Sequence, residues 1–153
     1  MELPSDRPLR VEDAAVPVQY RVYPETPLAE VIDLMVRRDV RALPVVGERY
    51  EVLGIITSGD ALGRVLKEAP ADDSADGGAQ PLLVRDVMTR AVLCVSESQP
   101  LTEAGRMMVN RKVEQLPVVR DGELVGLITR DAVLRALHGG GPDNDNPNKA
   151  EQS

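Results

Sequence analysis

The sequence predicts an α/β protein, α+β in detail, made of two similar units in tandem, each a small sheet backed by helices. The first observation is an internal repeat. Leu43-Pro44-Val45-Val46 recurs as Leu116-Pro117-Val118-Val119, an offset of 73 residues. Gly54–Thr57 recurs as Gly126–Thr129, and a repeat this long defines the architecture. The second observation is that an amphipathic segment follows each Gly–Thr run, which is typical of a buried strand leading into a helix.

The first repeat opens with a strand and a helix. Val18, Tyr20 and Val22 alternate with polar residues, as in a half-buried strand. Thr26-Pro27 is a typical helix start, and an apolar stripe follows at the spacing of one helix face. The stripe consists of Leu28, Val31, Ile32 and Met35. Arg37-Arg38-Asp39 is expected to end this helix.

Two further strands and a second helix complete each unit. Residues 42–46 and 52–57 are apolar enough to be paired strands, and the copies in the second repeat are joined by Asp121-Gly122, a strong signal for a tight hairpin. The order strand, helix, strand, strand, helix is therefore predicted twice. In the second repeat the helical stripe has Gly105 in place of Ile32, and the methionines of both stripes are predicted core residues.

Composition restricts the possible functions. The 153-residue chain has a formal net charge of −7, and most of it lies in residues 68–81 and in the C-terminal tail. The folded body is thus nearly neutral and holds few aromatic residues, which argues against a nucleic-acid surface. The single Cys94 excludes an internal disulfide. We find no membrane span and no signal peptide, so a cytoplasmic location is expected.

The repeats and the polar segments give the expected domain boundaries. Residues 11–68 form the first unit and residues 82–138 the second. The Pro-rich residues 1–10 are an expected arm, and residues 69–81 an expected flexible linker. Residues 139–153 are predicted to be a disordered tail, because they have too little apolar surface to bury.

The first Gly–Thr run ends in a polar corner, Thr57-Ser58-Gly59-Asp60. Such a corner sets a helix N-terminus, with free backbone N–H groups, beside a hydroxyl and a carboxylate. This combination suits a ligand that carries both an anionic group and a diol. Gly59 would let a backbone N–H approach a phosphate closely. The alternative is that Thr57 and Asp60 only cap the helix.

No catalytic set is present in the sequence. His138 is the only histidine and lies beside three glycines, Cys94 lies in an apolar stretch predicted to be a strand, and potential metal ligands do not cluster. The chain is therefore expected not to be an enzyme. Arg37-Arg38 and Arg111-Lys112 are most simply interpreted as helix ends in solvent. Together with Arg41, they are also the candidate cations to meet a phosphate across a cleft.

Taken in order, these motifs resemble the cystathionine-beta-synthase (CBS) domain, and two in tandem resemble a Bateman module. The motifs on which this resemblance rests are, in order, hydrophobic-Pro-Val-Val, a short turn, Gly-Ile-Ile-Thr-x-x-Asp and a helix. In addition, Val84–Thr89 is similar to the family's leading segment. The resemblance covers roughly residues 10–138. It implies two CBS-type βαββα units related by a pseudo-twofold axis, with two clefts between them. Family members bind AMP, ADP, ATP or S-adenosylmethionine there and act as sensors, with no resident cofactor required.

The resemblance also implies a set of ligand-binding residues, and the two clefts differ in it. The set comprises Val18, Ala42, Leu43, Pro44, Thr57, Ser58, Gly59, Asp60, Thr89, Leu116, Pro117, Thr129, Arg130 and Asp131. Val16 stands where the second repeat has Thr89, so the first cleft is expected to lack a hydroxyl. Ala132 stands where the family has Asp, and Asp131 falls one residue early. Thr89 and Arg130 favour the second cleft. Each cleft is therefore expected to have one defect, a missing hydroxyl at Val16 in the first and a missing carboxylate at Ala132 in the second.

Two functions remain open from the sequence. The first is a sensor that binds an adenosine ligand and signals to an unknown downstream protein. The second is a ligand-free dimerisation or interaction module on the same fold. A homodimer is expected in either case, because the apolar helical stripes exceed what one small sheet can cover.

Overall fold

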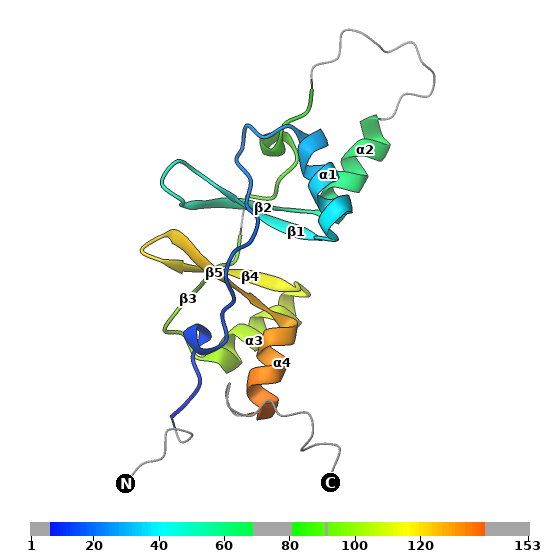
Figure 1. Cartoon of the computed structure of the whole chain (residues 1–153). Coiled ribbons are helices and arrows are strands. Elements are labelled where there is room, and N and C mark those ends of the chain that lie inside the picture. Colours follow the sequence, from blue (N-terminus) through cyan, green and yellow to red (C-terminus); the bar gives the residue numbers. More distant parts are fainter. Residues whose placement is uncertain (1–6, 69–80, 91, 140–153) are drawn as a thin grey trace. The chain divides into compact units, whose positions relative to one another are not determined.

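The computed structural model describes residues 7–68, 81–90 and 92–139. The chain divides into two compact units, Gln19–Val92 and a unit that combines Met1–Val18 with Leu93–Ser153. Each unit is a mixed α/β body with helices against a small sheet, as predicted (Figure 1). Residues 1–6 of the predicted arm, 69–80 of the linker and 140–153 of the tail lie outside the described residues.

The unit Gln19–Val92 is built on an antiparallel hairpin. Its elements are α1 (Leu28–Arg38), β1 (Ala42–Val46), β2 (Val52–Thr57), α2 (Ser58–Glu68) and the 3-10 turn η3 (Val84–Asp86). Strands β1 and β2 pair with Leu43 opposite Ile56, and both of these side chains are buried. Val31 and Met35 of α1 join the same core, as the predicted stripe requires. The helix ends at Arg38, and Asp39 follows in the left-handed conformation.

The other unit repeats this plan with one more strand. Its elements are η2 (Val11–Asp13), β3 (Val95–Ser96), α3 (Leu101–Arg111), β4 (Gln115–Arg120), β5 (Glu123–Thr129) and α4 (Arg130–Gly139). The sheet order is β3-β4-β5, with β3 parallel to β4. Asp121 and Gly122 both have positive φ, 53° and 83°, which confirms the tight hairpin turn. Met108 is buried in the core, as predicted.

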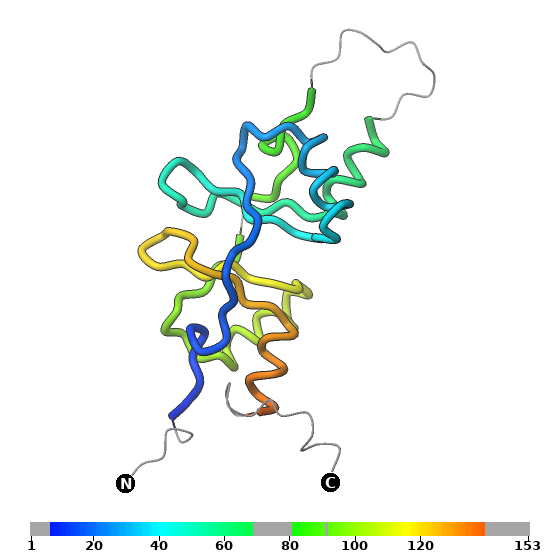
Figure 2. Tube along the Cα trace, in the orientation of Figure 1, coloured from blue at the N-terminus to red at the C-terminus, as the bar shows by residue number. Residues whose placement is uncertain are grey.

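The leading segments are exchanged between the repeats. Thr89, which leads the second repeat, pairs with Ile55 of β2 through two backbone hydrogen bonds of 2.8 and 2.9 Å. Val16, which leads the first repeat, makes the same pair of bonds with Leu127 of β5. Figure 2 shows the N-terminal segment, in blue, within the unit of α3 and α4. The compact units therefore differ from the sequence repeats.

The strand predicted at Val18–Val22 is wrong in extent, since only Val22 pairs, through an isolated parallel bridge to Val45. The Val22 N–H donates to the Pro44 carbonyl at 3.0 Å, and the Val46 N–H donates to the Val22 carbonyl at 2.9 Å. To extend this parallel pairing one step toward the N-terminus, the backbone N–H of Pro44 would have to donate a hydrogen bond. Proline has no N–H, so the pairing stops at Val22. Pro117 sets the same limit on β3, and Cys94 lies just before that strand rather than in it.

Candidate ligand-binding corners

The first corner joins β2 to α2 through a reciprocal cap. The Asp60 N–H donates to Thr57 Oγ1 at 3.0 Å, and the Thr57 N–H donates to Asp60 Oδ2 at 3.2 Å. These two bonds fix the carboxylate beside the first turn of α2. A carboxylate offers about four acceptor sites, so this cap leaves Asp60 able to accept further hydrogen bonds. The cap and the ligand site predicted from the sequence are thus compatible.

The residues between Thr57 and Asp60 lie open to solvent. Ser58 and Gly59 are exposed, and a Cβ on Gly59 would meet only Thr57 Oγ1, at 3.8 Å. Packing therefore does not require glycine at this position. The Ser58 N–H already donates to the Arg41 carbonyl at 2.8 Å and the Asp60 N–H to Thr57 Oγ1, so the Gly59 N–H is the group in this first turn that could meet an anion.

Thr89 lies in the same unit as this corner. Its backbone pairs with Ile55, two residues before Thr57, and its side chain is exposed. Gly54 makes the pairing possible, because a Cβ there would lie 2.5 Å from the Thr89 carbonyl oxygen. Two hydroxyl residues and a carboxylate therefore belong to one unit.

The second corner has the same cap geometry without the carboxylate. The Ala132 N–H donates to Thr129 Oγ1 at 3.1 Å, as the Asp60 N–H does to Thr57. Ala132 is therefore the structural equivalent of Asp60, and its side chain is buried. Asp131 is directed elsewhere and forms an exposed ion pair with Arg135 one turn along α4.

Arg130 is also engaged within its own unit. Its Nε donates to the Val113 carbonyl at 3.0 Å, close to the C-terminal end of α3. Val16 lies beside this corner, as Thr89 lies beside the first. The sequence predicted one defect in each cleft, with Thr89 on the side of Arg130. The structure instead places both defects, Val16 and Ala132, in the unit of α4, because the leading segments are exchanged.

Comparison with known proteins identifies the family. The CBS domain model matches the chain twice, over residues 11–67 and 84–139. This chain belongs to the CBS domain family. Each match follows a sequence repeat, so each CBS domain gives its leading turn to the compact unit of the other.

Individual relatives support this assignment. The CBS domain-containing protein CBSX1, chloroplastic, of Arabidopsis thaliana is 33% identical over 135 residues, which cover 75% of this chain and 57% of that protein. The chain thus spans little more than half of this relative. The crystal structure of CBSX2 in complex with AMP matches with a TM-score of 0.71 and 32% identity, over 84% of this chain and 96% of that one. The CBS domain pair of protein MJ0100 in complex with 5-methylthioadenosine and S-adenosyl-L-methionine has a TM-score of 0.66 at 22% identity, over 87% and 98% of the two chains, and shows the fold alone.

The remaining predicted site residues differ in what they can offer a ligand. Leu43 and Leu116 are each 1% exposed and belong to the two hydrophobic cores. Pro44 and Pro117 are buried beside them in β1 and β4, whereas Val18 and Ala42 are half-buried. The four buried residues can therefore offer a ligand mainly their backbone atoms, whereas Val18 and Ala42 also have partly accessible side chains.

The described residues contain no metal centre. No group of three or more His, Cys, Asp or Glu in this part of the chain is placed to hold a metal ion. Burial raises the pKa of the half-buried Cys94 thiol, which disfavours the reactive thiolate. His138 is exposed in the last turn of α4. No helix within these residues has both the length and the apolar character that a membrane crossing requires.

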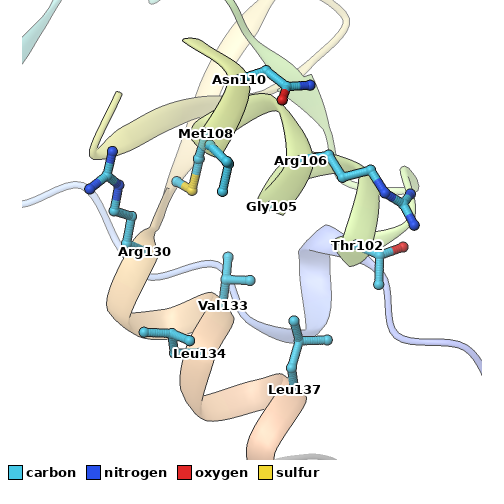
Figure 3. Close-up of a pocket in the computed structure, with 10 residues that line it drawn as sticks. Thr102, Gly105, Arg106, Met108, Asn110, Arg130, Val133, Leu134 and Leu137 are labelled. Atoms are coloured by element: carbon cyan, nitrogen blue, oxygen red, sulfur yellow. The ribbon is translucent and has the colours of Figure 1, made fainter. Parts of the chain in front are cut away.

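Sequence reasoning missed a groove between α3 and α4 of about 650 Å³. Val133 and Leu137 point from α4 toward α3, where Gly105 places no side chain opposite them (Figure 3). Arg106 lies at one end of this groove and Arg130 at the other. The sequence feature that indicates this groove is the glycine at position 105 of the second repeat, where the first repeat has Ile32.

Proposed function

We propose that this chain is a regulatory module that binds an adenosine-type ligand at the corner formed by Thr57, Ser58, Gly59 and Asp60. The backbone N–H of Gly59, at the start of α2, would bind the phosphate or its equivalent. Asp60 would accept hydrogen bonds from the ribose hydroxyls. The geometry of the corner and the likeness to CBSX2, whose structure is named as a complex with AMP, support this proposal.

The observation that carries the proposal is that Asp60 and Thr89 belong to one compact unit. The other unit has Ala132 and Val16 at the equivalent positions, and its charged residues Asp131 and Arg130 are engaged with neighbours in the same unit. We therefore expect one ligand per chain, at the corner of α2.

The candidate ligands are AMP, ADP, ATP and S-adenosylmethionine, and the proposed role is non-catalytic, with no resident cofactor. Binding would signal to a downstream protein by favouring one conformation of the module over another. The size of this shift is limited by the difference between the ligand's affinities for the two conformations. A cytoplasmic location stays a prediction from the sequence, and the relative CBSX1 is named as chloroplastic.

A thermal-shift panel of these four compounds tests the proposal, followed by calorimetry on any that bind. A ligand present at 100 times its dissociation constant stabilises the folded protein by about 2.7 kcal/mol, which raises the melting temperature measurably. Guanosine and cytidine nucleotides serve as controls for the adenine ring. If none of the four compounds shifts melting or gives heat, the adenosine-sensor proposal fails.

The second candidate is a ligand-free dimerisation or interaction module. Exposed apolar side chains on the helices favour a protein-binding role, and Val36 of α1 and Val109 of α3 are 76% and 72% exposed. We propose a homodimer in either case, because a twofold assembly is the commonest way to cover such faces. Light scattering tests it, and a dimer that binds none of the four compounds would favour the second candidate.

A further inference from the structure

Helix α2 carries three charged side chains along one face. Asp60, Arg64 and Glu68 follow one another at intervals of four residues, so they lie one above the other on the helix surface. The Arg64 Nε donates to Glu68 Oε2 at 3.2 Å, and this bond orients the guanidinium. The row therefore begins at the carboxylate proposed to bind ribose and continues along α2 away from the corner.

Arg64 also reaches the segment that carries Thr89. Its Nη1 donates to the Asp86 carbonyl at 2.8 Å, and Asp86 is the last residue of η3. Thr89 follows only three residues later. One side chain thus connects the helix that bears Asp60 to the turn that leads into Thr89.

We propose that Arg64 is a positioning residue for the ligand site. By fixing η3 on α2, it holds the Thr89 hydroxyl in a constant place relative to the Asp60 carboxylate. The bond from its guanidinium to the Asp86 carbonyl is charge-assisted, and such bonds are stronger than those between neutral groups. The inference rests on the proposed adenosine site at this corner and adds a residue that acts on the ligand through Thr89.

The unit of α4 supports this role, because it lacks both the connection and the proposed ligand residues. The repeat places Ala136 of α4 where α2 has Arg64, four residues after Ala132. Ala136 has no polar side-chain group to donate, and it packs against the core of its unit. Alanines thus replace the first two charged residues of the row in the same unit that has Val16 in place of Thr89.

The leading turn of the α4 unit is held by a different contact. The Arg7 Nη2 donates to Asp13 Oδ1 at 3.1 Å, and Asp13 corresponds to Asp86 in the repeat. This arginine comes from the chain just before η2 and not from a helix. A leading turn can therefore fold without an arginine from the adjoining helix, so folding alone does not account for Arg64.

The Arg64→Ala variant tests the role by calorimetry. It should fold, because Val84 and Met88 still anchor the leading segment in the core. The probe is AMP, or whichever of ADP, ATP and S-adenosylmethionine binds the wild type more tightly. We expect its affinity to fall about 3–10-fold, which is the value of one hydrogen bond. Arg135→Ala, which removes an exposed ion pair on α4, is the matched control and should leave the affinity unchanged.

The outcomes of this experiment separate the two proposals. If the wild type binds and Arg64→Ala binds equally well, the positioning role is overturned and the proposed function stands. If the wild type binds none of the four compounds, both are overturned.

A double-mutant cycle with Thr89→Val separates positioning from direct contact with the ligand. Thr89→Val should itself weaken binding, because it removes the hydroxyl. With no hydroxyl left to position, adding Arg64→Ala should then change the affinity less than about twofold. Additive losses, or a Thr89→Val protein that binds as tightly as wild type, would overturn the positioning role.

Hydrogen exchange of the ligand-free protein measures the same connection. The Thr89 N–H donates to the Ile55 carbonyl at 2.8 Å, and the Ile55 N–H donates to the Thr89 carbonyl at 2.9 Å. Arg64→Ala should raise the exchange rates of these two amides about threefold or more relative to the amides that pair β1 with β2, because the leading segment opens locally more often. Equal relative rates in wild type and variant would show that Arg64 does not fix this segment and would overturn the inference.

Discussion

Thr57 and Asp60 cap one another across the junction of β2 and α2, with backbone-to-side-chain hydrogen bonds of 3.2 and 3.0 Å in the two directions. At the other corner only half of this arrangement exists, because Ala132 has no carboxylate to return a bond to Thr129. Asp131 does not substitute for it, since it pairs with Arg135. The two corners thus share a fold and differ in the one group proposed to bind ribose.

The first prediction concerns Asp60. Asp60→Ala removes a charge-assisted hydrogen bond to the proposed ligand, worth about 1.5–3 kcal/mol, so the affinity for AMP should fall about 10–150-fold. The same change also removes half of the cap and should lower the free energy of unfolding by about 1 kcal/mol. Calorimetry measures the affinity, and urea unfolding measures the stability.

Asp131→Ala is the matched control for that prediction. It removes an exposed ion pair on α4 and should leave the affinity for AMP unchanged. A stability loss in Asp60→Ala without any loss of affinity would show that Asp60 is a helix cap only. Equal losses of affinity in both variants would contradict the assignment of Ala132 as the equivalent of Asp60.

The second prediction concerns Gly54. In Gly54→Ala the new Cβ would lie 2.5 Å from the Thr89 carbonyl oxygen, so the leading segment must move away from β2. Losing the two backbone hydrogen bonds between Ile55 and Thr89 should cost about 2–3 kcal/mol of unfolding free energy, at about 1 kcal/mol each plus the strain. Chemical denaturation measures this loss.

Gly63→Ala is the control for the loss of a glycine. Gly63 lies in α2 and a Cβ there would meet nothing within 4 Å, so alanine should stabilise the protein by about 0.5–1 kcal/mol. Gly126→Ala should be intermediate, because its Cβ would lie 3.2 Å from the Val16 carbonyl oxygen. A Gly54→Ala protein as stable as wild type would contradict the close approach.

Much of this fold follows from local patterns in the sequence. The predicted bounds of β1 and β2, the stripe of α1 and the turn at Asp121-Gly122 all match the structure, because periodicity and turn chemistry are local properties. The extent of pairing at Val22 was harder to predict, since it depends on which N–H groups a neighbouring strand offers, and Pro44 offers none.

The candidate site was harder still to predict. The sequence shows that Val16 and Thr89 are equivalent, but it does not show onto which β-strand each segment packs. That choice decides whether the two defects fall on different corners or on one. The groove at Gly105 was equally hard to predict from the sequence, because its volume depends on which side chain packs opposite Gly105, and this side chain is Val133.

The third prediction concerns pH. Arg120 donates to both carboxylate oxygens of Glu97 at 2.8 Å, and this hydrogen bonding lowers the pKa of Glu97 from its usual value of about 4.3. A lowered folded-state pKa means that the pair stabilises the protein above that usual value. The contribution is lost as the pH falls through the folded-state pKa. Glu97→Gln should therefore destabilise at neutral pH and lose less stability than wild type on acidification.

Urea midpoints between about pH 3 and pH 7 measure this difference, over the range in which carboxylates titrate. High salt should shrink it, because Arg120 is exposed and exposed charges are screened. Glu48→Gln, in the exposed turn between β1 and β2, is the control. Parallel acid profiles for wild type and Glu97→Gln would show that the pair contributes nothing to stability.

The last prediction is that the second corner can be repaired. Val16→Thr supplies the hydroxyl that Thr89 has at the equivalent position, and Ala132→Asp supplies the carboxylate. The Ala132 N–H already donates to Thr129 Oγ1, so an aspartate there can accept from the Thr129 N–H and complete the cap. Given AMP binding at the first corner, calorimetry should show one ligand per chain for wild type and two for the double variant. The Val16→Thr variant alone should still bind one ligand per chain, because the second corner would lack the carboxylate that accepts hydrogen bonds from the ribose. Two ligands bound by the wild type would mean that the carboxylate at Asp60 is not what selects the site.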